Sequence, residues 1–399
     1  MNNNRQIRHR PLLLATAMII LVVFSRLIQA DTGACGGASI TLPFTDVQAS
    51  NNFFCAIAEA YFSGITNGTS PTTYNPSDPV PREQMAAFIT RTQDSALKRG
   101  NRRAALQQWW TPTEAAALRT ISGFSSPVDI VCDGTDLWVP SFAASGTVKR
   151  IRASDGQLLQ TWTGANSVLG LIAAAGRIFV VAQTSPGKIY VINPEASPGA
   201  VTIFENDIGP NPVQITYDGA NLWTANISGS ISRVNVATVI DSTFTAGFSN
   251  PTDILWDGSN LWVADPGDNK LKRIDPSNAT VLESISVGNS PRNLLFDGTN
   301  IWVSNAHSDS ITVVRAVGGL RGTVLATLTG NGLNFPLGMA FDGERVLVCN
   351  NSFSVSLFKA ADFTPLGNLA TQSIPGGPVA ACSDGVNFWF SAGNLIVRF

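Results

Sequence analysis

The sequence has few of the residues that build metal centres and acid-base catalytic sites. Its 399 residues include two histidines, five cysteines and four methionines. His9 lies in the N-terminal leader, so His307 is the one histidine in the rest of the chain. This scarcity excludes metal sites built on several histidines and argues against a Ser-His-Asp triad. We expect no catalytic residue, no metal site and no cofactor, and we expect His307 to be a loop residue.

Charged residues are also scarce, and their balance argues against a nucleic-acid partner. They make up 14% of the chain, and the formal net charge is −2. Loss of the leader described below would remove four arginines and no acid, which moves the charge to −6. A mildly acidic protein lacks the clustered Lys and Arg that bind phosphate backbones. The only basic run, within residues 98–103, lies in an apparent linker and is expected to be a solvated segment.

The first 30 residues are typical of a signal peptide. A basic segment precedes an apolar run over residues 12–24, and Ile28-Gln29-Ala30 offers a cleavage site before Asp31. The alternative is a transmembrane anchor, but the run has 13 residues, whereas a spanning helix needs about 20. We therefore predict a signal peptide over residues 1–30 and an exported protein of the cell envelope, cell surface or periplasm.

An Asp-Gly turn between two apolar runs recurs along the C-terminal part of the chain. In the copy at residues 251–285, a proline opens the first run, and Leu261-Trp262 opens the second. Glycine supplies the positive φ that such turns require. The turn glycines are Gly134, Gly176, Gly219, Gly258, Gly298, Gly343 and Gly385, with spacings of 42, 43, 39, 40, 45 and 42 residues. This period is typical of four-stranded propeller blades.

Seven repeats predict an all-β fold, a seven-bladed β-propeller over residues 117–399. One blade cannot bury both faces of its sheet, whereas a closed ring of blades can. The last repeat ends at its third strand, at 395–399, and we expect residues 118–121 to supply its fourth strand and close the ring. The tryptophans of the second strands are expected to pack between blades. The run Asp-Gly-Ser-Asn-Leu-Trp-Val-Ala-Asp at 257–265 resembles NHL and YVTN propeller repeats, which implies this fold and often an extracellular binding or scaffolding role.

Residues 31–100 are expected to form a small helix-loop-helix module, followed by a linker over residues 101–116. The segments Phe44-Thr45-Asp46-Val47, Gly64-Ile65-Thr66-Asn67-Gly68, Tyr74-Asn75-Pro76 and 81–88 resemble an S-layer homology (SLH) motif. The resemblance implies non-covalent attachment to cell-wall polysaccharide or another envelope polymer. Arg82 matches the arginine of the family's motif and is the implied polymer-binding residue. A docking module without a ligand is the alternative.

Polar residues at the loops before the first strand and after the second strand of each blade are expected to surround the mouth of the central channel. Their mixed character suits a glycan, a peptide or a weakly held cation better than a catalytic device. For each residue the alternative is turn capping, and an all-oxygen metal site from Asp129, Asp253 and Asp265 stays open. The candidate ligand-binding residues are Asp129, Asn226, Asp253, Asp265, Arg292, Asn305 and Asn350.

Five cysteines are too few for a disulfide-stapled miniature. Cys35 and Cys55 share the small module and could bridge in an exported protein. Cys132 and Cys382 fall on the first strands of the first and last blades, which adjoin if the ring closes. Either a disulfide or two packed thiols is expected there.

These observations predict an exported envelope protein in which a non-catalytic binding or scaffold propeller is held at the cell wall by the small module. The expected partners are cell-wall polysaccharide or another envelope polymer, and a protein or glycan at the propeller face. The alternative is a metal-dependent hydrolase or lyase, similar to lactonases or streptogramin lyases, because such enzymes share the architecture. That alternative requires a divalent ion at the channel mouth.

Overall fold

The computed structural model describes residues 32–35, 38–62, 66, 68–82, 84–86, 88 and 118–399. The chain divides into two compact units, residues 1–94 and residues 95–399. The predicted signal peptide and the linker at 101–116 lie outside the described residues. Among the helices that are described, none is long and apolar enough to span a bilayer.

The N-terminal unit contains a two-stranded hairpin and a helix that a disulfide connects. β1 (Thr32–Cys35) pairs with β2 (Ala38–Thr41), and α2 spans Phe54–Phe62. Cys35 at the end of β1 is bonded to Cys55 in α2, one of the two bridges that the sequence suggested. Further helical residues occur at 82, 84–86 and 88.

The SLH-like residues form the interior of this unit. Phe44 is fully buried and its ring lies 5.1 Å from that of Tyr61 and 5.2 Å from that of Tyr74. Asp46 accepts backbone N–H bonds from Tyr74 at 2.9 Å and from Asn75 at 2.7 Å, which fixes the long loop. Gly68 has a φ of +76°, and a Cβ there would lie 2.5 Å from the Phe44 ring. Much of the motif is therefore needed for folding.

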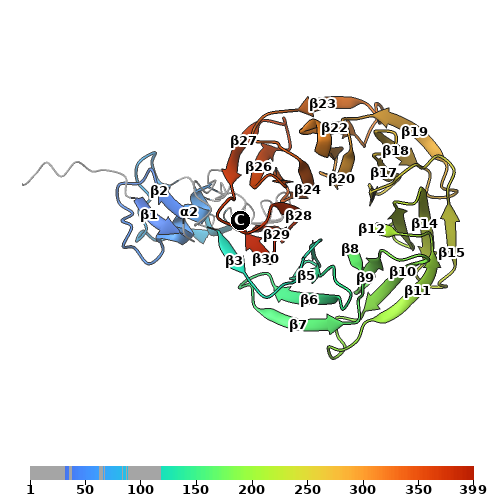
Figure 1. The fold of residues 1–399 in the computed structure, drawn as a ribbon. Helices are drawn as coiled ribbons and strands as arrows, with labels where there is room; N and C mark the ends of the chain where they lie inside the picture. Colours follow the sequence, from blue (N-terminus) through green and yellow to red (C-terminus); the bar gives the residue numbers. More distant parts are fainter. Residues whose placement is uncertain are drawn as a thin grey trace, which may run out of the picture. The chain divides into compact units, whose positions relative to one another are not determined.

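The C-terminal unit is a ring of seven four-stranded antiparallel sheets, as predicted (Figure 1). In each sheet the first strand (strand A) lies next to the central channel and the fourth (strand D) lies at the outside. Blade 1 consists of β4 (Val131–Cys132), β5 (Asp136–Pro140), β6 (Thr147–Arg152) and β7 (Leu158–Thr163). Blade 2 consists of β8 (Val168–Ala174), β9 (Arg177–Ala182), β10 (Gly187–Ile192) and β11 (Thr202–Ile208). Blade 3 consists of β12 (Pro212–Tyr217), β13 (Asn221–Asn226), β14 (Ser230–Asn235) and β15 (Asp241–Phe244).

The remaining four blades repeat this order. Blade 4 consists of β16 (Asp253–Trp256), β17 (Leu261–Asp265), β18 (Lys270–Ile274) and β19 (Val281–Ser286). Blade 5 consists of β20 (Pro291–Phe296), β21 (Asn300–Asn305), β22 (Ser310–Arg315) and β23 (Val324–Leu328). Blade 6 consists of β24 (Pro336–Phe341), β25 (Arg345–Asn350), β26 (Ser354–Lys359) and β27 (Pro365–Ala370). Blade 7 consists of β28 (Pro378–Ser383), β29 (Phe388–Ala392), β30 (Leu395–Arg398) and β3 (Arg119–Ile121).

The ring closes through a strand from the other end of the propeller sequence. β3 pairs antiparallel with β30, with Arg119 opposite Arg398 and Ile121 opposite Ile396. Figure 1 shows β3 joining the first and last blades. Blade 7 therefore has three strands from the C-terminal end and one from upstream of blade 1, as the sequence predicted. This arrangement covers the edge that β30 would otherwise expose.

One Asp-Trp pair recurs in the blades and explains the sequence repeat. In blade 4, Asp257 accepts the backbone N–H groups of Ser259 and Asn260 through Oδ1 and the indole N–H of Trp262 through Oδ2, each at 2.7 Å. The buried indole N–H thus has a partner, as burial requires. The same indole bond joins Trp138 to Asp133, Trp223 to Asp218, Trp302 to Asp297 and Trp389 to Asp384. All five tryptophans are fully buried, consistent with the predicted packing between blades.

Candidate functional site

The channel between the A strands contains a cavity of about 550 Å³. The third residue of each A-strand segment contributes to its wall, and the polar members are concentrated in blades 1, 3, 4 and 5. In blade order, these third residues are Asp129, Gly170, Gln214, Asp253, Asn293, Gly338 and Ala380.

The channel carboxylates hold neighbouring blades together. Asp253 accepts the N–H of Ile254 from its own blade at 2.7 Å, and the N–H of Leu294 from blade 5 at 2.6 Å. The Asn293 side chain donates a further bond to Asp253 at 2.9 Å and accepts the N–H of Met339 from blade 6 at 3.2 Å. Blades 4, 5 and 6 are thus linked by two side chains at one level of the channel.

A second link of this kind crosses blade 2. Asp129 accepts the N–H of Leu171 at 3.2 Å, and Gln214 from blade 3 donates to the same carboxylate at 3.3 Å. A Cβ on Gly170 would lie 2.1 Å from the Gln214 side-chain oxygen and 2.7 Å from the backbone oxygen of Val213. Glycine at this position therefore gives Gln214 the space to reach Asp129.

Both channel carboxyl groups hold their protons more firmly than usual. Burial raises the pKa of Asp253 from 3.8 to about 8, although the N–H bonds from Leu294 and Ile254 act in the opposite direction, and the Asp129 carboxylate adds to the rise. Burial likewise raises the pKa of Asp129 to about 6. Desolvation of the charged form is the larger effect at both positions.

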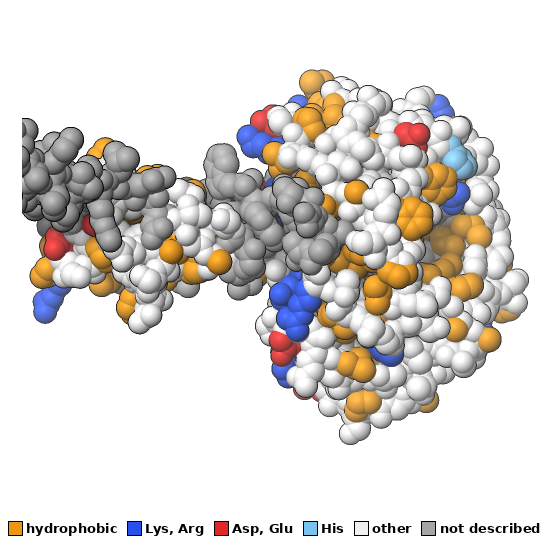
Figure 2. Space-filling view, turned by 60° about the vertical axis from the view of Figure 1, so that its left-hand side comes forward, with side chains coloured by type: hydrophobic (Ala, Val, Ile, Leu, Met, Phe, Trp, Pro, Cys, Tyr) orange, Lys and Arg blue, Asp and Glu red, His pale blue; other side chains and the backbone are white. Residues whose placement is uncertain are grey.

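The residues that precede these groups in the A-strand segments make the cavity wall mostly aliphatic, apart from Thr252 in blade 4 and one cation in blade 5. The second residues of the A-strand segments are half-buried and mostly branched, namely Val128, Leu169, Val213, Leu337 and Val379. Arg292 occupies this position in blade 5, is exposed, and makes no ion pair with a described residue. Figure 2 shows hydrophobic side chains within a hollow on the face that carries the histidine. We call this set of side chains the channel collar.

The structure corrects the expected position of four candidates. Asn226, Asp265, Asn305 and Asn350, at the ends of the second strands, are 0% exposed and bond within their own blades. Asn226 donates to the hydroxyls of Ser230 and Ser232, at 3.0 and 2.9 Å. Asn305 and Asn350 make the corresponding bonds to Thr312 and Ser356, at 2.9 and 2.8 Å. These amides organise the loops inside the blade, as the turn-capping alternative holds, and do not line the mouth.

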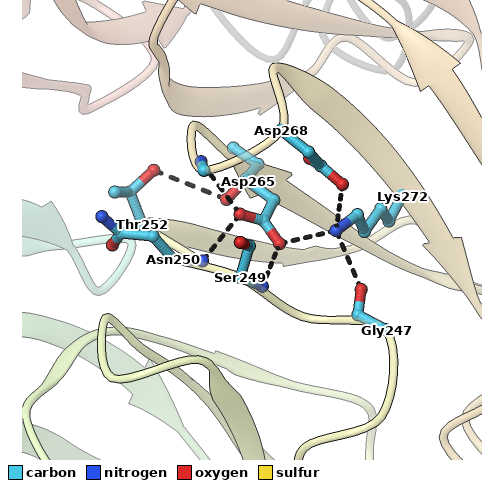
Figure 3. Close-up of polar contacts among 9 residues, drawn as sticks. Gly247, Ser249, Asn250, Thr252, Asp265, Asp268 and Lys272 are labelled. Carbon is cyan, nitrogen blue, oxygen red and sulfur yellow. Dashed lines mark hydrogen bonds and ion pairs between the residues drawn. The ribbon is translucent and has the colours of Figure 1, made fainter.

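Blade 4 replaces the Asn-Ser pair by a buried ion pair (Figure 3). Lys272 lies 2.6 Å from Asp265, and their side chains are 4% and 0% exposed. Asp265 also accepts the N–H groups of Ser249 and Asn250, both at 2.8 Å. The carboxylate is therefore surrounded by donors from the loop that leads into strand A. It has no oxygen directed toward the channel cavity, whose lining does not include it.

The other expected residues occupy simpler surroundings. Cys132 and Cys382 are free, pack against the same hydrophobic cluster between blades 7 and 1, and represent the packed-thiol alternative. His307, expected in a loop, is exposed in the short 3₁₀ helix η2 (Ala306–Ser308), with its ring 5.4 Å from that of Phe335. Among the described residues, no three His, Cys, Asp or Glu side chains are placed to hold a metal ion. In the N-terminal unit, Arg82 is exposed in the first turn of its helical segment.

Comparisons with known proteins agree with both parts of the chain. Residues 43–86 match the S-layer homology domain. An endoglucanase of Bacillus sp. (strain KSM-635) is 32% identical over 87 residues, which is 22% of this chain and 9% of the endoglucanase. The chain thus spans less than a tenth of the length of this relative. SLH domains bind cell-wall polymers, so the match places the protein at the cell envelope, in association with the cell surface.

Solved structures with the same fold support the propeller. The WD40 β-propeller domain of Doa1 superposes with a TM-score of 0.59 at 14% identity, covering 70% of this chain and 95% of that domain. Hydrazine synthase of Kuenenia stuttgartiensis gives a TM-score of 0.57 at 16% identity, covering 70% and 97% respectively. At these identities the likeness establishes the fold alone. The chain therefore combines an N-terminal S-layer homology domain with a seven-bladed β-propeller.

Proposed function

We propose that this protein is a non-catalytic binding or scaffold protein, exported and held at the cell wall by its SLH domain, with the propeller as the ligand-binding part. The observation that carries the anchoring step is the position of Arg82. It is the only Lys or Arg between residues 31 and 88, and it is exposed. A guanidinium forms paired, charge-assisted bonds with carboxylate or phosphate, so Arg82 is suited to an anionic envelope polymer.

Retention on isolated cell wall tests the anchor. We expect the full-length protein to sediment with wall fragments, and Arg82→Ala to reduce retention several-fold at low salt because the single cation is lost. Arg82→Lys should retain less than the parent, since an ammonium lacks the bidentate fork. Arg152→Ala, an exposed position on the propeller, provides a control with the same change in net charge. Equal retention of Arg82→Ala and Arg152→Ala would contradict the role of Arg82.

For the propeller, we propose that the channel collar binds a glycan or peptide fragment. Arg292 would contact an acidic or polar group, and the aliphatic side chains would pack against the apolar part. Binding is favoured over acid-base chemistry because the oxygens of Asp129 and Asp253 already accept backbone N–H groups from the neighbouring blade. Titration with soluble wall-derived glycans and peptides, comparing the parent with Arg292→Ala, tests this assignment. Binding that Arg292→Ala leaves unchanged would count against the collar as the site.

A further inference from the structure

A comparison of the five tryptophan-bearing blades shows a missing arginine in blade 5. In the other four blades an arginine on the third strand lies directly opposite the tryptophan of the second strand. These arginines are Arg150, Arg233, Arg273 and Arg398. In blade 5, Val313 lies opposite Trp302.

Arg273 in blade 4 is paired with Glu283 at 3.3 Å, whereas the arginines of the other three blades share one environment. The guanidinium lies 5.3 Å from the Trp138 ring in blade 1, 5.6 Å from Trp223 in blade 3 and 5.8 Å from Trp389 in blade 7. The guanidinium also donates to a backbone oxygen in the turn between the third and fourth strands of the next blade. The acceptors are Pro194 for Arg150, Ser277 for Arg233 and Ser154 for Arg398, at 3.3, 3.3 and 3.5 Å.

The residue three positions after the turn aspartate is the second recurring acceptor. In blade 1, Asp136 accepts from Arg150 at 2.7 Å, and in blade 4, Asn260 accepts from Arg273 at 3.2 Å. In blade 5 this position is Asn300, which is 8% exposed. Its amide nitrogen donates to Asp297 at 3.1 Å, and because a carboxylate only accepts, Asn300 Oδ1 must point the other way. No described residue donates to that buried oxygen.

A cavity lies between blades 5 and 6 where the arginine would run. Its volume is about 690 Å³, and its wall includes Asn300 together with Ala361, the residue of blade 6 that corresponds to Ser277. The equivalent cavity between blades 1 and 2 includes Arg150 in its wall and has a volume of about 380 Å³. We call the larger cavity the blade 5–6 slot. Its further walls are the apolar Phe341, Ala360 and Leu366.

The wall of the slot contains both acidic and basic side chains. Asp297 and Glu344 belong to it, together with Arg345 and Lys359. Each of the two basic side chains forms an ion pair with a carboxylate outside the wall, at 2.8 Å to Asp342 and 3.0 Å to Asp362. An arginine side chain would place its stem on the apolar wall and its guanidinium beside the unpaired oxygen.

We propose that the blade 5–6 slot binds the guanidinium group of an arginine side chain presented by a partner peptide or protein. The ligand would supply the arginine that Val313 replaces. Arginine fits better than lysine because the slot offers two acceptors, Asn300 Oδ1 and the Ala361 carbonyl. In blade 1 the planar guanidinium of Arg150 likewise reaches a side-chain and a backbone acceptor, Asp136 and the Pro194 carbonyl. This inference is independent of the channel collar and of the SLH domain.

Small arginine derivatives test the slot on the full-length protein. We expect N-acetyl-arginine amide, titrated calorimetrically at low ionic strength, to bind at least about 10-fold more tightly than N-acetyl-citrulline amide, its neutral isostere, because charge-assisted bonds are about twice as strong as neutral ones. Asn300→Asp should tighten arginine binding about 5-fold, since it reproduces the Asp136 carboxylate that holds Arg150. Asn260→Asp, in the blade that has its own arginine, is the matched control and should leave binding unchanged.

Filling the slot with the chain's own side chain provides the second test. Val313→Arg should reduce the affinity for N-acetyl-arginine amide at least about 10-fold, because the tethered guanidinium competes at a high effective concentration. Trp302 already contacts Phe363 at 5.5 Å between ring centroids, so this variant has to accommodate a tight neighbour. If it does not fold, the comparison of Asn300→Asp with Asn260→Asp decides. Equal binding of the arginine and citrulline amides, or an unchanged affinity in Asn300→Asp, would overturn the proposal.

Discussion

Replacement of Lys272 by serine tests how blade 4 stabilises a buried charge. Lys272 Nζ lies 2.6 Å from Asp265, 2.8 Å from Asp268 and 2.8 Å from the carbonyl of Gly247. Its loss leaves the Asp265 carboxylate buried with backbone N–H donors but without a countercharge. Breaking one partner of a buried ion pair destabilises a protein by about 3–5 kcal/mol. We expect Lys272→Ser to lower the free energy of unfolding by an amount in this range.

The sister blades supply the matched compensating change. Blades 3, 5 and 6 have Asn at the position of Asp265 and Ser or Thr at the position of Lys272, joined at 2.8–2.9 Å. Asp265→Asn combined with Lys272→Ser recreates this neutral pair. One of the two N–H bonds from Ser249 and Asn250 would be weakened, so the double variant should lose only about 1 kcal/mol.

Denaturant unfolding followed by tryptophan fluorescence measures these differences, provided that the dependence on denaturant concentration is the same in each variant. The single and double variants complete a double-mutant cycle, whose coupling energy should be about 2–4 kcal/mol. The reasoning is refuted if Lys272→Ser costs no more than the double variant, because the carboxylate would then be satisfied by its N–H donors alone.

Three further predictions concern the channel, blade 1 and the closing blades. Asp253 has a folded pKa of about 8, raised from 3.8, so the stability it contributes is fully present below about pH 4 and is lost as the pH rises through 8. Between pH 5 and 8 the unfolding free energy of the parent should fall by up to about 1.4 kcal/mol per pH unit. Asp253→Asn should flatten this dependence. In blade 1, Ser141 is the counterpart of Asp265 and Lys149 is the counterpart of Lys272. Ser141 is 2% exposed, and its hydroxyl has no hydrogen-bond partner among the described residues. Ser141→Asp should therefore be tolerated with Lys149 present and should cost about 3 kcal/mol more in the Lys149→Met background, as chemical denaturation would show. Desolvation raises the pKa of the partly buried Cys382 thiol well above 9.0, so a thiol reagent at pH 8 should label this cysteine at least about 10-fold more slowly in the native protein than in denaturant. Fast native labelling would contradict this shielding.

The fold was predictable because each blade repeats the same local sequence features. The Asp-Gly turn, the apolar pair after it and the period of about 40 residues are all visible in one sequence, and the closing strand was found because 118–121 resembles the fourth strand of other repeats. The indole bond from Trp262 to Asp257 was missed, although both residues recur at a fixed spacing of five. Recurrence of an acceptor and a donor at constant spacing was the signal that could have revealed it.

The site was less predictable because a loop position does not determine whether a side chain faces solvent. Asn226, Asn305 and Asn350 end their strands next to the channel face, yet Ser or Thr six or seven residues later holds each amide inside the blade. Asp253 and Arg292 do line the channel cavity, because they belong to the strand segments nearest the axis. The position of a residue within the repeat could not distinguish the buried amides from the residues that line the cavity, since both groups lie at the same end of their blades.

In a propeller, each position can be compared with its counterparts in the other blades, so a departure from the pattern identifies a local requirement. Blade 4 differs from the other blades by the Asp265–Lys272 ion pair. Both residues of the pair differ from their counterparts, so the buried charge of one is compensated by the other within the blade. Blade 5 departs at Val313, and there the compensation is incomplete: Phe358 and Phe363 pack against Trp302, but Asn300 keeps an oxygen to which no described residue donates, and the cavity beside it remains open. A buried acceptor without a partner is destabilising by about 1–3 kcal/mol. Such a defect persists most readily where a ligand supplies the missing donor, which is why the blade 5–6 slot, rather than the buried loop amides, is the next position to test.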